Sequence, residues 1–232
     1  MIKVLIKKLA SYAGFERIVR RPTLQTFLEH HQVDLVIDVG ANTGQFGQEL
    51  RKGGYKGKIH SFEPIRDVFR MLEDASANDP LWTVTNAGIG SSRGNAQINV
   101  AEFSVYSSIK PISSVGTAFD TRTSTLRTEE ISVVTLTDVL SDKLSDSIFI
   151  KIDTQGFERE VLQGAVEVLP HCVGVQLELP VEHLYQDVWS FSDAVAYMAN
   201  LGFVPAQFDM VNTLRDDPSS GVEFDCIFRR SA

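Results

Sequence analysis

An apolar segment that runs into a glycine-bracketed turn constrains the fold of this chain more than any other feature. The segment reads Asp34-Leu-Val-Ile-Asp-Val-Gly-Ala-Asn-Thr-Gly44 and places Asp38 just before the turn. A second short apolar run, Lys58–Phe62, ends in Glu63-Pro64. A strand, a glycine turn and a helix, with an acidic residue closing the next strand, are how doubly wound α/β proteins hold the ribose of a nucleotide-like ligand. The two segments therefore predict a cofactor site.

The residues of the turn discriminate between three classes of ligand. A dinucleotide turn reads G-x-G-x-x-G, and here Asn42 stands in place of the first glycine. A triphosphate loop requires Gly-Lys-Ser/Thr, whereas Gly44 is followed by Gln45. The carboxylate of Asp38 would repel a pyrophosphate but attract the ammonium group of a methionine moiety. These residues favour S-adenosylmethionine over NAD(P) and nucleoside triphosphates.

Length and charge limit the organisation of the chain and its partners. With 232 residues, 43% of them hydrophobic, the chain has enough apolar material for one substantial core, so we expect one main domain over residues 33–232. The net charge of −8 argues against nucleic acid as the main partner, because that binding depends on clustered cations.

The first 32 residues differ in composition from the rest. They begin with a basic, amphipathic stretch whose apolar run, Val4-Leu-Ile6, is too short for a signal peptide or a membrane span. We expect a helical extension packed beside the domain, with contact to an anionic surface as the alternative. Cys172 and Cys226 lie in apolar runs and are expected to be buried thiols of a cytoplasmic protein.

Strand and helix patterns alternate along the chain, which predicts a doubly wound, Rossmann-like α/β sheet. After the first two strands, further strands are expected over 81–87, 147–153 and 172–179, with helices over 45–52, 65–77 and 158–169. Residues 94–103 and 130–135 predict an inserted β-hairpin, and 202–205 with 222–228 predict a closing antiparallel hairpin. The serine- and threonine-rich segment 104–129 lacks periodicity, and we expect it to be a lid-like loop, mobile without substrate, that sets substrate choice, with an untethered surface loop as the alternative.

A second group of charged residues follows the strand expected at 147–153. The sequence Lys151-Ile-Asp-Thr-Gln-Gly-Phe-Glu158 surrounds a strand end with a lysine and two carboxylates, and Glu178 ends the next strand. Ligands of open α/β sheets bind at the carboxyl ends of the strands, so Asp153, Glu158 and Glu178 are catalytic candidates. They could act as a general base, bind substrate hydroxyls or hold a divalent metal. Glu158 has the alternative role of complementing the dipole of the helix it begins.

Together, these motifs and several further segments resemble those of the FkbM-type methyltransferases. The resemblance covers about residue 33 to the C-terminus, and the Lys151–Glu158 block is its most specific part. The matching segments, in chain order, are Asp38-Val-Gly-Ala-Asn-Thr-Gly44, Phe62-Glu63-Pro64, Asn86-Ala-Gly-Ile, Leu136-Thr-Asp-Val-Leu140, Lys151-Ile-Asp-Thr-Gln-Gly-Phe-Glu158, Val161-Leu-Gln-Gly164 and Gln176-Leu-Glu178.

The resemblance implies a mostly parallel seven-stranded sheet, S-adenosylmethionine as cofactor and O-methylation of a sugar or small-molecule hydroxyl. It assigns the methionine and ribose side of the cofactor to Asp38, Gly40, Asn42 and Gly44, with Phe46 alongside, the ribose to Glu63 beside Pro64, and the adenine border to Asn86 and Ala87. Asp153 would lie near both the sulfonium and the acceptor.

We expect Asp153 to be the base or the acceptor-orienting group, with Glu178 as second choice and Glu158 supporting the turn. A divalent metal held by these strand-end carboxylates is an alternative. The alternative functions are a cofactor-binding scaffold without activity and, on weaker grounds, an NAD-dependent oxidoreductase.

Overall fold

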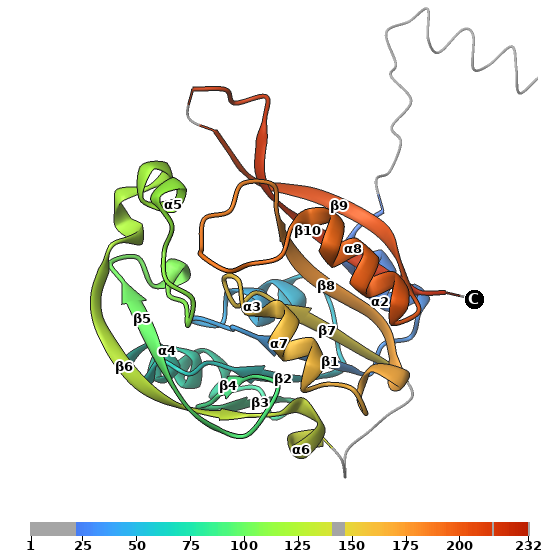
Figure 1. Cartoon of the computed structure of the whole chain (residues 1–232). Coiled ribbons are helices and arrows are strands. Elements are labelled where there is room, and N and C mark those ends of the chain that lie inside the picture. Colours follow the sequence, from blue (N-terminus) through green and yellow to red (C-terminus); the bar gives the residue numbers. More distant parts are fainter. Residues whose placement is uncertain (1–21, 141–146, 215, 232) are drawn as a thin grey trace, which may run out of the picture.

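The computed structural model describes residues 22–140, 147–214 and 216–231. In this part of the chain seven strands form one sheet in the order β3-β2-β1-β7-β8-β10-β9 (Figure 1). Strands β3, β2, β1, β7 and β8 run parallel to one another, and β10 runs antiparallel to both of its neighbours. The strands are β1 (Leu35–Val39), β2 (Lys58–Phe62), β3 (Trp82–Thr85), β7 (Ile148–Ile152), β8 (Cys172–Pro180), β9 (Phe203–Thr213) and β10 (Gly221–Arg230). The predicted Rossmann-like sheet with its closing antiparallel hairpin is confirmed.

The strand order reverses between β1 and β7, the neighbouring strands at the middle of the sheet. From β1 the chain adds β2 and β3 on one side, and it later adds β7 and β8 on the other. Strands β1 and β7 are buried at every position, as parallel strands covered on both faces require. The crevice beyond the carboxyl ends of β1 and β7 is therefore the topological switch point, where open α/β sheets bind their ligands.

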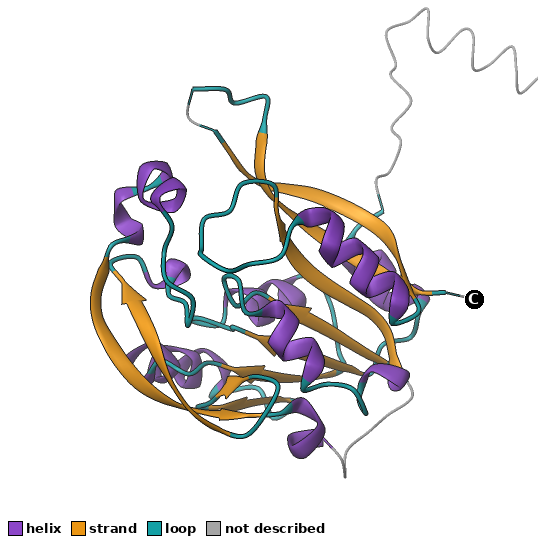
Figure 2. Ribbon diagram, in the orientation of Figure 1, coloured by secondary structure: helices purple, strands orange, loops and turns teal. Residues whose placement is uncertain are grey.

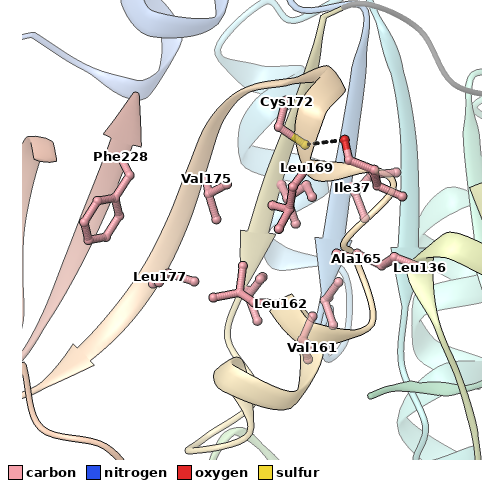
Figure 3. Close-up of a cluster of buried hydrophobic side chains, with 14 of the residues drawn as sticks. Ile37, Leu136, Val161, Leu162, Ala165, Leu169, Cys172, Val175, Leu177 and Phe228 are labelled. Atoms are coloured by element: carbon pink, nitrogen blue, oxygen red, sulfur yellow. Dashed lines mark hydrogen bonds between the residues drawn. The ribbon is translucent and has the colours of Figure 1, made fainter. Parts of the chain in front are cut away.

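Helices cover both faces of the sheet (Figure 2). Apolar side chains of α2 (Leu24–His30), α3 (Gln45–Lys52) and α4 (Arg66–Ser76) pack on one face. Those of α6 (Leu136–Leu140), α7 (Glu158–Gln163) and α8 (Phe191–Asn200) pack on the other. Figure 3 shows part of this second layer, in which Val161 and Leu162 of α7 lie among Val175 and Leu177 of β8. The two layers hold the strand ends that carry the polar residues.

The inserted segment forms a small second sheet instead of a simple hairpin. Its strands β4 (Gly88–Ile89), β5 (Gly94–Ala101) and β6 (Thr125–Val134) pair in the order β4-β6-β5. The segment over 104–129, expected to be a lid-like loop, contains the short helices Ser104–Tyr106, α5 (Ser114–Phe119) and Thr121–Thr123 and the first half of β6. Its role as a lid stays a prediction. Ile112 and Phe119 from this segment pack against Leu184 and Val222, which supplies the apolar anchor that periodicity did not reveal.

Element boundaries differ from the sequence-based expectation at several places. The helix expected over 158–169 ends at Gln163, and a single 3-10 turn, Leu169–His171, follows it. Gly164 closes α7 where the chain passes close to Gly90: a methyl group at Gly164 would collide with the Gly90 carbonyl oxygen. The strand expected over 130–135 is longer, because its outer half pairs with β5 although its side chains are mostly exposed.

The described part of the N-terminal extension belongs to the core of the domain. Phe27 and Leu28 of α2 are buried, and the ring of Phe27 packs edge-on against Phe149 of β7. The expectation for residues 1–21 lies outside the described residues. Cys172 and Cys226 are buried free thiols, as expected. Within the described ranges, no helix is both long and apolar enough to span a membrane.

Candidate functional site

A cavity of about 310 Å³ opens at the switch point of the sheet. This volume is within the range of small-molecule sites. The cavity extends from the turn after β1, past the ends of β2 and β7, to the ends of β8 and β10, and the inserted segment covers it through Ser104, Val105, Ser107 and Ile109. Eight of the residues expected at the site line it: Gly40, Asn42, Phe46, Glu63, Pro64, Ala87, Asp153 and Glu178.

The turn after β1 depends on a glycine at its first position. Gly40 has a φ of +77°, and a methyl group there would collide with the carbonyl oxygen of Asp153. The backbone N–H groups of Gly40 and Ala41 donate to the carbonyl of Phe62, at 3.1 and 3.0 Å. The turn is thus held between the ends of β2 and β7, and Gly40 brings the two conspicuous motifs of the sequence into contact.

Glu63 lies at the end of β2 and is almost fully buried. One of its carboxylate oxygens accepts from the backbone N–H of Asn42 at 3.0 Å, and the other accepts from that of Ile65 at 2.9 Å. Burial raises the pKa of Glu63 to about 7, although these two N–H donors oppose the effect. A carboxylate that lines a cavity and is short of solvation is suited to accept hydrogen bonds from a ligand's hydroxyl groups.

Asp38 does not line the cavity but lies beneath its floor. Its side chain is fully buried, accepts from Ser61 Oγ at 3.0 Å and lies 3.4 Å from Lys151 Nζ. Register explains this, because Asp38 is paired with Ser61 on one side and with Lys151 on the other. The direct contact with a ligand ammonium that we expected of Asp38 does not fit this geometry.

Lys151 is the buried cation at the centre of the site. Its ammonium donates to the Gly40 carbonyl at 3.1 Å and lies 3.4 Å from Asp153 Oδ2, with the ring of Phe46 above it. Burial alone would lower the pKa of Lys151, but the carboxylates of Asp153 and Asp38 raise it above its usual value. The ammonium therefore ties the turn after β1 to the catalytic candidate at the end of β7.

Asp153 and Glu178 lie together, bridged by a residue that sequence reasoning did not select. The side-chain amide of Gln155 donates at 2.7 Å to Asp153 Oδ1 and at 2.7 Å to Glu178 Oε2. The Asp153 side chain is 36% exposed and therefore accessible from the cavity. Burial, and then the charge of Asp153, raise the pKa of Glu178 well above its usual value. The expected pairing of strand-end carboxylates at one crevice is observed.

Glu158 serves the turn between β7 and α7. One of its oxygens accepts from the N–H groups of Thr154 and Gly156 and from the Thr154 hydroxyl, at 3.0 to 3.1 Å. It is almost fully buried and lies outside the lining of the cavity. The geometry supports the turn-stabilising role for Glu158, not direct catalysis.

Gly44 and Asn86 do not line the cavity but support residues that do. Gly44, with a φ of +89°, is the N-cap of α3. The Asn86 amide donates to the carbonyls of Glu63 and Pro64, at 2.8 and 3.0 Å, and thereby holds the end of β2. Neither residue is among those that line the cavity.

Residues from the C-terminal hairpin also line the cavity, and sequence reasoning missed them. Asp225 of β10 is paired with Glu178 of β8 and lines the cavity together with Val211 of β9. Burial raises the pKa of Asp225 to about 6. The only available signal was the alternation within Val222-Glu-Phe-Asp-Cys226, which does not reveal the register. Among the residues that the structure describes, no group of three or more His, Cys, Asp or Glu side chains is arranged to hold a metal ion.

Comparison with known proteins gives the class of this protein. The family model described as "Methyltransferase FkbM domain" matches residues 38–205, most of the chain. The chain therefore belongs to the FkbM methyltransferase family, and S-adenosylmethionine is its cofactor. The search of curated proteins found no match.

Solved structures with a similar arrangement are distant in sequence. The Mg-protoporphyrin IX methyltransferase of Synechocystis PCC 6803 is 11% identical, with 99% of this chain and 97% of that chain covered and a TM-score of 0.46. The precorrin-6y C5,15-methyltransferase of Geobacter metallireducens GS-15 is 12% identical, with 94% and 92% covered and a TM-score of 0.48. Aeropyrum pernix fibrillarin with bound S-adenosyl-L-methionine is 9% identical, with 84% and 66% covered and a TM-score of 0.47.

Proposed function

We propose that this methyltransferase transfers the methyl group to a hydroxyl of a sugar or another small molecule, such as a secondary metabolite. The observation that supports this most is the position of Asp153. Its carboxylate is exposed to the same cavity that the turn at Gly40 and the carboxylate of Glu63 line. An alcohol is a weak nucleophile at neutral pH, and a carboxylate in that position can take its proton.

The cofactor would be held by the residues around the turn after β1. Gly40 and Asn42 would border its methionine and ribose side, with Phe46 next to them, and Glu63 would accept the ribose hydroxyls. Ala87 would border the adenine. Asp38, Gly44 and Asn86 would act indirectly, since their contacts are with Lys151, with α3 and with the backbone at Glu63. When bound, S-adenosylmethionine supplies an activated methyl group.

In the proposed reaction Asp153 accepts the hydroxyl proton of the acceptor. The bound donor would supply its methyl group to that oxygen, with cleavage of its carbon–sulfur bond and S-adenosylhomocysteine as the leaving product. Lys151, with its ammonium 3.4 Å from Asp153 Oδ2, provides a counter-charge beside this carboxylate, and Gln155 orients it, so that much of the rate would come from alignment of the acceptor. Glu178 is the second candidate for the base.

The electrostatics of the cavity support a small acceptor over a nucleic acid. Carboxylates of Glu49, Glu63, Asp153, Glu178 and Asp225 line it, with Lys151 as the buried counter-charge. A phosphate backbone would be repelled by this lining and by the net charge of −8. The proposal includes a cytoplasmic location, where the two free thiols would stay reduced.

The test is a screen with labelled methyl donor against hydroxylated sugars and metabolites, with an RNA mixture as comparison. We expect label in a hydroxylated small molecule and an O-methyl ether in the product by NMR. Transfer to nitrogen or carbon, or to RNA alone, would contradict the proposal. Calorimetric titration with S-adenosylhomocysteine and with NAD tests the cofactor separately from the acceptor.

The ionisation of Glu63 predicts a pH dependence of cofactor binding. If the ionised carboxylate accepts the ribose hydroxyls, affinity is constant above the pKa of about 7 and falls about tenfold per pH unit below it, because the competent fraction falls by that factor. The measurement is the Kd of S-adenosylhomocysteine by calorimetry between pH 5.5 and 8. Glu63→Gln should bind about 10- to 100-fold more weakly at pH 8 and lose the pH dependence.

A matched control is Glu49→Gln, which changes an exposed carboxylate at the rim of the same cavity. It should keep the wild-type profile. A wild-type affinity that does not change between pH 5.5 and 8 would refute the role of Glu63.

A further inference from the structure

Gln155 holds an unusual backbone conformation between the two catalytic candidates. Its φ is +55°, a left-handed value that side chains other than glycine seldom adopt and that carries a conformational cost. Such a conformation persists where the surrounding contacts determine it. In Gln155 these contacts are made by the nitrogen and the oxygen of the side-chain amide and by the backbone carbonyl.

The side-chain amide of Gln155 has one possible orientation in its network. Its NH₂ group has two hydrogens and lies 2.7 Å from one oxygen each of Asp153 and Glu178. Its carbonyl oxygen lies 2.7 Å from the hydroxyl of Tyr185, which is a donor. A flipped amide would place its oxygen against two carboxylates, so the network selects the orientation described.

The inserted segment holds Gln155 at two points. Ser108, almost fully buried, donates from its hydroxyl to the Gln155 carbonyl at 2.6 Å. The hydroxyl of Tyr185 lies 3.0 Å from the carbonyl of Tyr106, as well as 2.7 Å from the Gln155 amide. The segment that covers the cavity is thereby connected to the residue that bridges the carboxylates.

We propose that Gln155 is a positioning residue, which orients Asp153 toward the acceptor and holds Glu178 beside it, and that Gln155 is fixed by Ser108 of the inserted segment and by Tyr185, whose hydroxyl lies against that segment. The proposal rests on the proposed function in that Asp153 is the base. Gln155 acts through the two carboxylates and is not assigned a contact with the transferred group.

The charges around the bridge make it testable by titration. The groups that face the two carboxylates are Lys151 on β7, Glu158 on α7, Glu223 and Asp225 on β10, and Tyr185. Most of these are acidic, and carboxylates this close disfavour each other's ionised form. The neutral N–H donor that Gln155 presents to Glu178 favours the ionised form of Glu178. Removal of that donor must therefore shift the titration of Glu178 upward.

The test compares wild type with Gln155→Met, which keeps the side-chain length and removes both N–H donors. In carbon-13 carboxyl NMR, assigned with Asp153→Asn and Glu178→Gln, we expect the midpoint for Glu178 to rise by about 1 pH unit. We expect kcat to fall by about 10- to 100-fold and the acid limb of its pH profile to move upward by a similar amount. The Kd of S-adenosylhomocysteine should stay within threefold.

Gln186→Met is the matched control. Gln186 follows Tyr185 in the chain and also contacts the inserted segment, since its side chain donates to the Ile112 carbonyl at 3.0 Å, but it does not contact the carboxylates. It should leave the NMR midpoints and the pH profile unchanged. Tyr185→Phe is a second test variant, which should move both in the same direction as Gln155→Met, by a smaller amount, because the amide loses the donor that orients it.

A Gln155→Met protein with wild-type midpoints and pH profile would overturn the inference, even if kcat and thermal stability fell, because that result would indicate a structural role alone. The NMR titration requires neither donor nor acceptor. If the wild type methylates a nitrogen or carbon, or if Asp153→Asn keeps full turnover, the proposed function fails while the titration still reports on the bridge.

Discussion

Replacement of Asp153 by asparagine should lower kcat for methyl transfer by about 100-fold or more while cofactor binding stays close to normal. Asparagine keeps the size of the side chain and an oxygen that can accept from Gln155, but it cannot take a proton from an acceptor hydroxyl. Lys151 keeps Asp38 as a partner, so the buried ammonium is not left without a counter-charge. The loss should therefore appear in kcat and not in the fold.

The measurement combines kcat at saturating donor with the Kd of S-adenosylhomocysteine. Asp79→Asn is the control, because it removes the carboxylate 2.6 Å from Arg51, outside the residues that line the cavity. That variant should keep its kcat within twofold. Full turnover by Asp153→Asn with normal cofactor affinity would show that Asp153 is not the base, and Glu178 would then be tested as Glu178→Gln.

Replacement of Gly40 by alanine should destabilise the protein and abolish cofactor binding together. The φ of +77° at Gly40 is unfavourable for alanine, by about 1–2 kcal/mol. The new methyl group would also collide with the backbone carbonyl of Asp153, which no side-chain rotation can relieve. Overpacking of this kind costs typically about 1–3 kcal/mol, so we expect a total loss of about 3 kcal/mol in the free energy of unfolding.

The variant Gly54→Ala separates the cost of the positive φ from the cost of the steric collision. Gly54 has a φ of +96°, but apart from Gly54 itself and its two chain neighbours no residue has an atom within 4 Å of the position that a methyl group would take. We expect this variant to lose about 1 kcal/mol and to bind S-adenosylhomocysteine normally. Urea unfolding gives the stabilities and calorimetry gives the affinities. Equal losses of stability in the two variants, with binding retained in Gly40→Ala, would show that the contact with Asp153 is unimportant.

The order of strands and helices was predictable because it depends on local patterns. The apolar runs at Leu35–Val39 and Ile148–Ile152 are buried on both faces and therefore read as continuous hydrophobic strands. The short helices within residues 104–129 were not predictable, because the apolar contacts that anchor this segment are with distant partners. Ile112 and Phe119 pack against Leu184 and Val222, which lie 65 to 110 positions later in the chain. No periodicity within the segment reports such contacts.

The sequence by itself determined the class of the protein and the two segments that form its site. A glycine turn after an apolar strand, an acidic residue after the next strand and the Lys151–Glu158 block are local features, and the family match over residues 38–205 agrees with them. Local features also indicate which residues end parallel strands, and the ends of such strands meet at one edge of a sheet.

Only the tertiary structure decided what each polar side chain contacts. Register places Asp38 opposite Lys151, so that Asp38 lies under the cavity instead of in its lining. Close approach of two strand ends places Gly40 against the backbone of Asp153. The inserted segment and Tyr185 hold Gln155 between Asp153 and Glu178. These contacts join residues far apart in the chain, and their geometry depends on register, burial and packing, which no local pattern specifies.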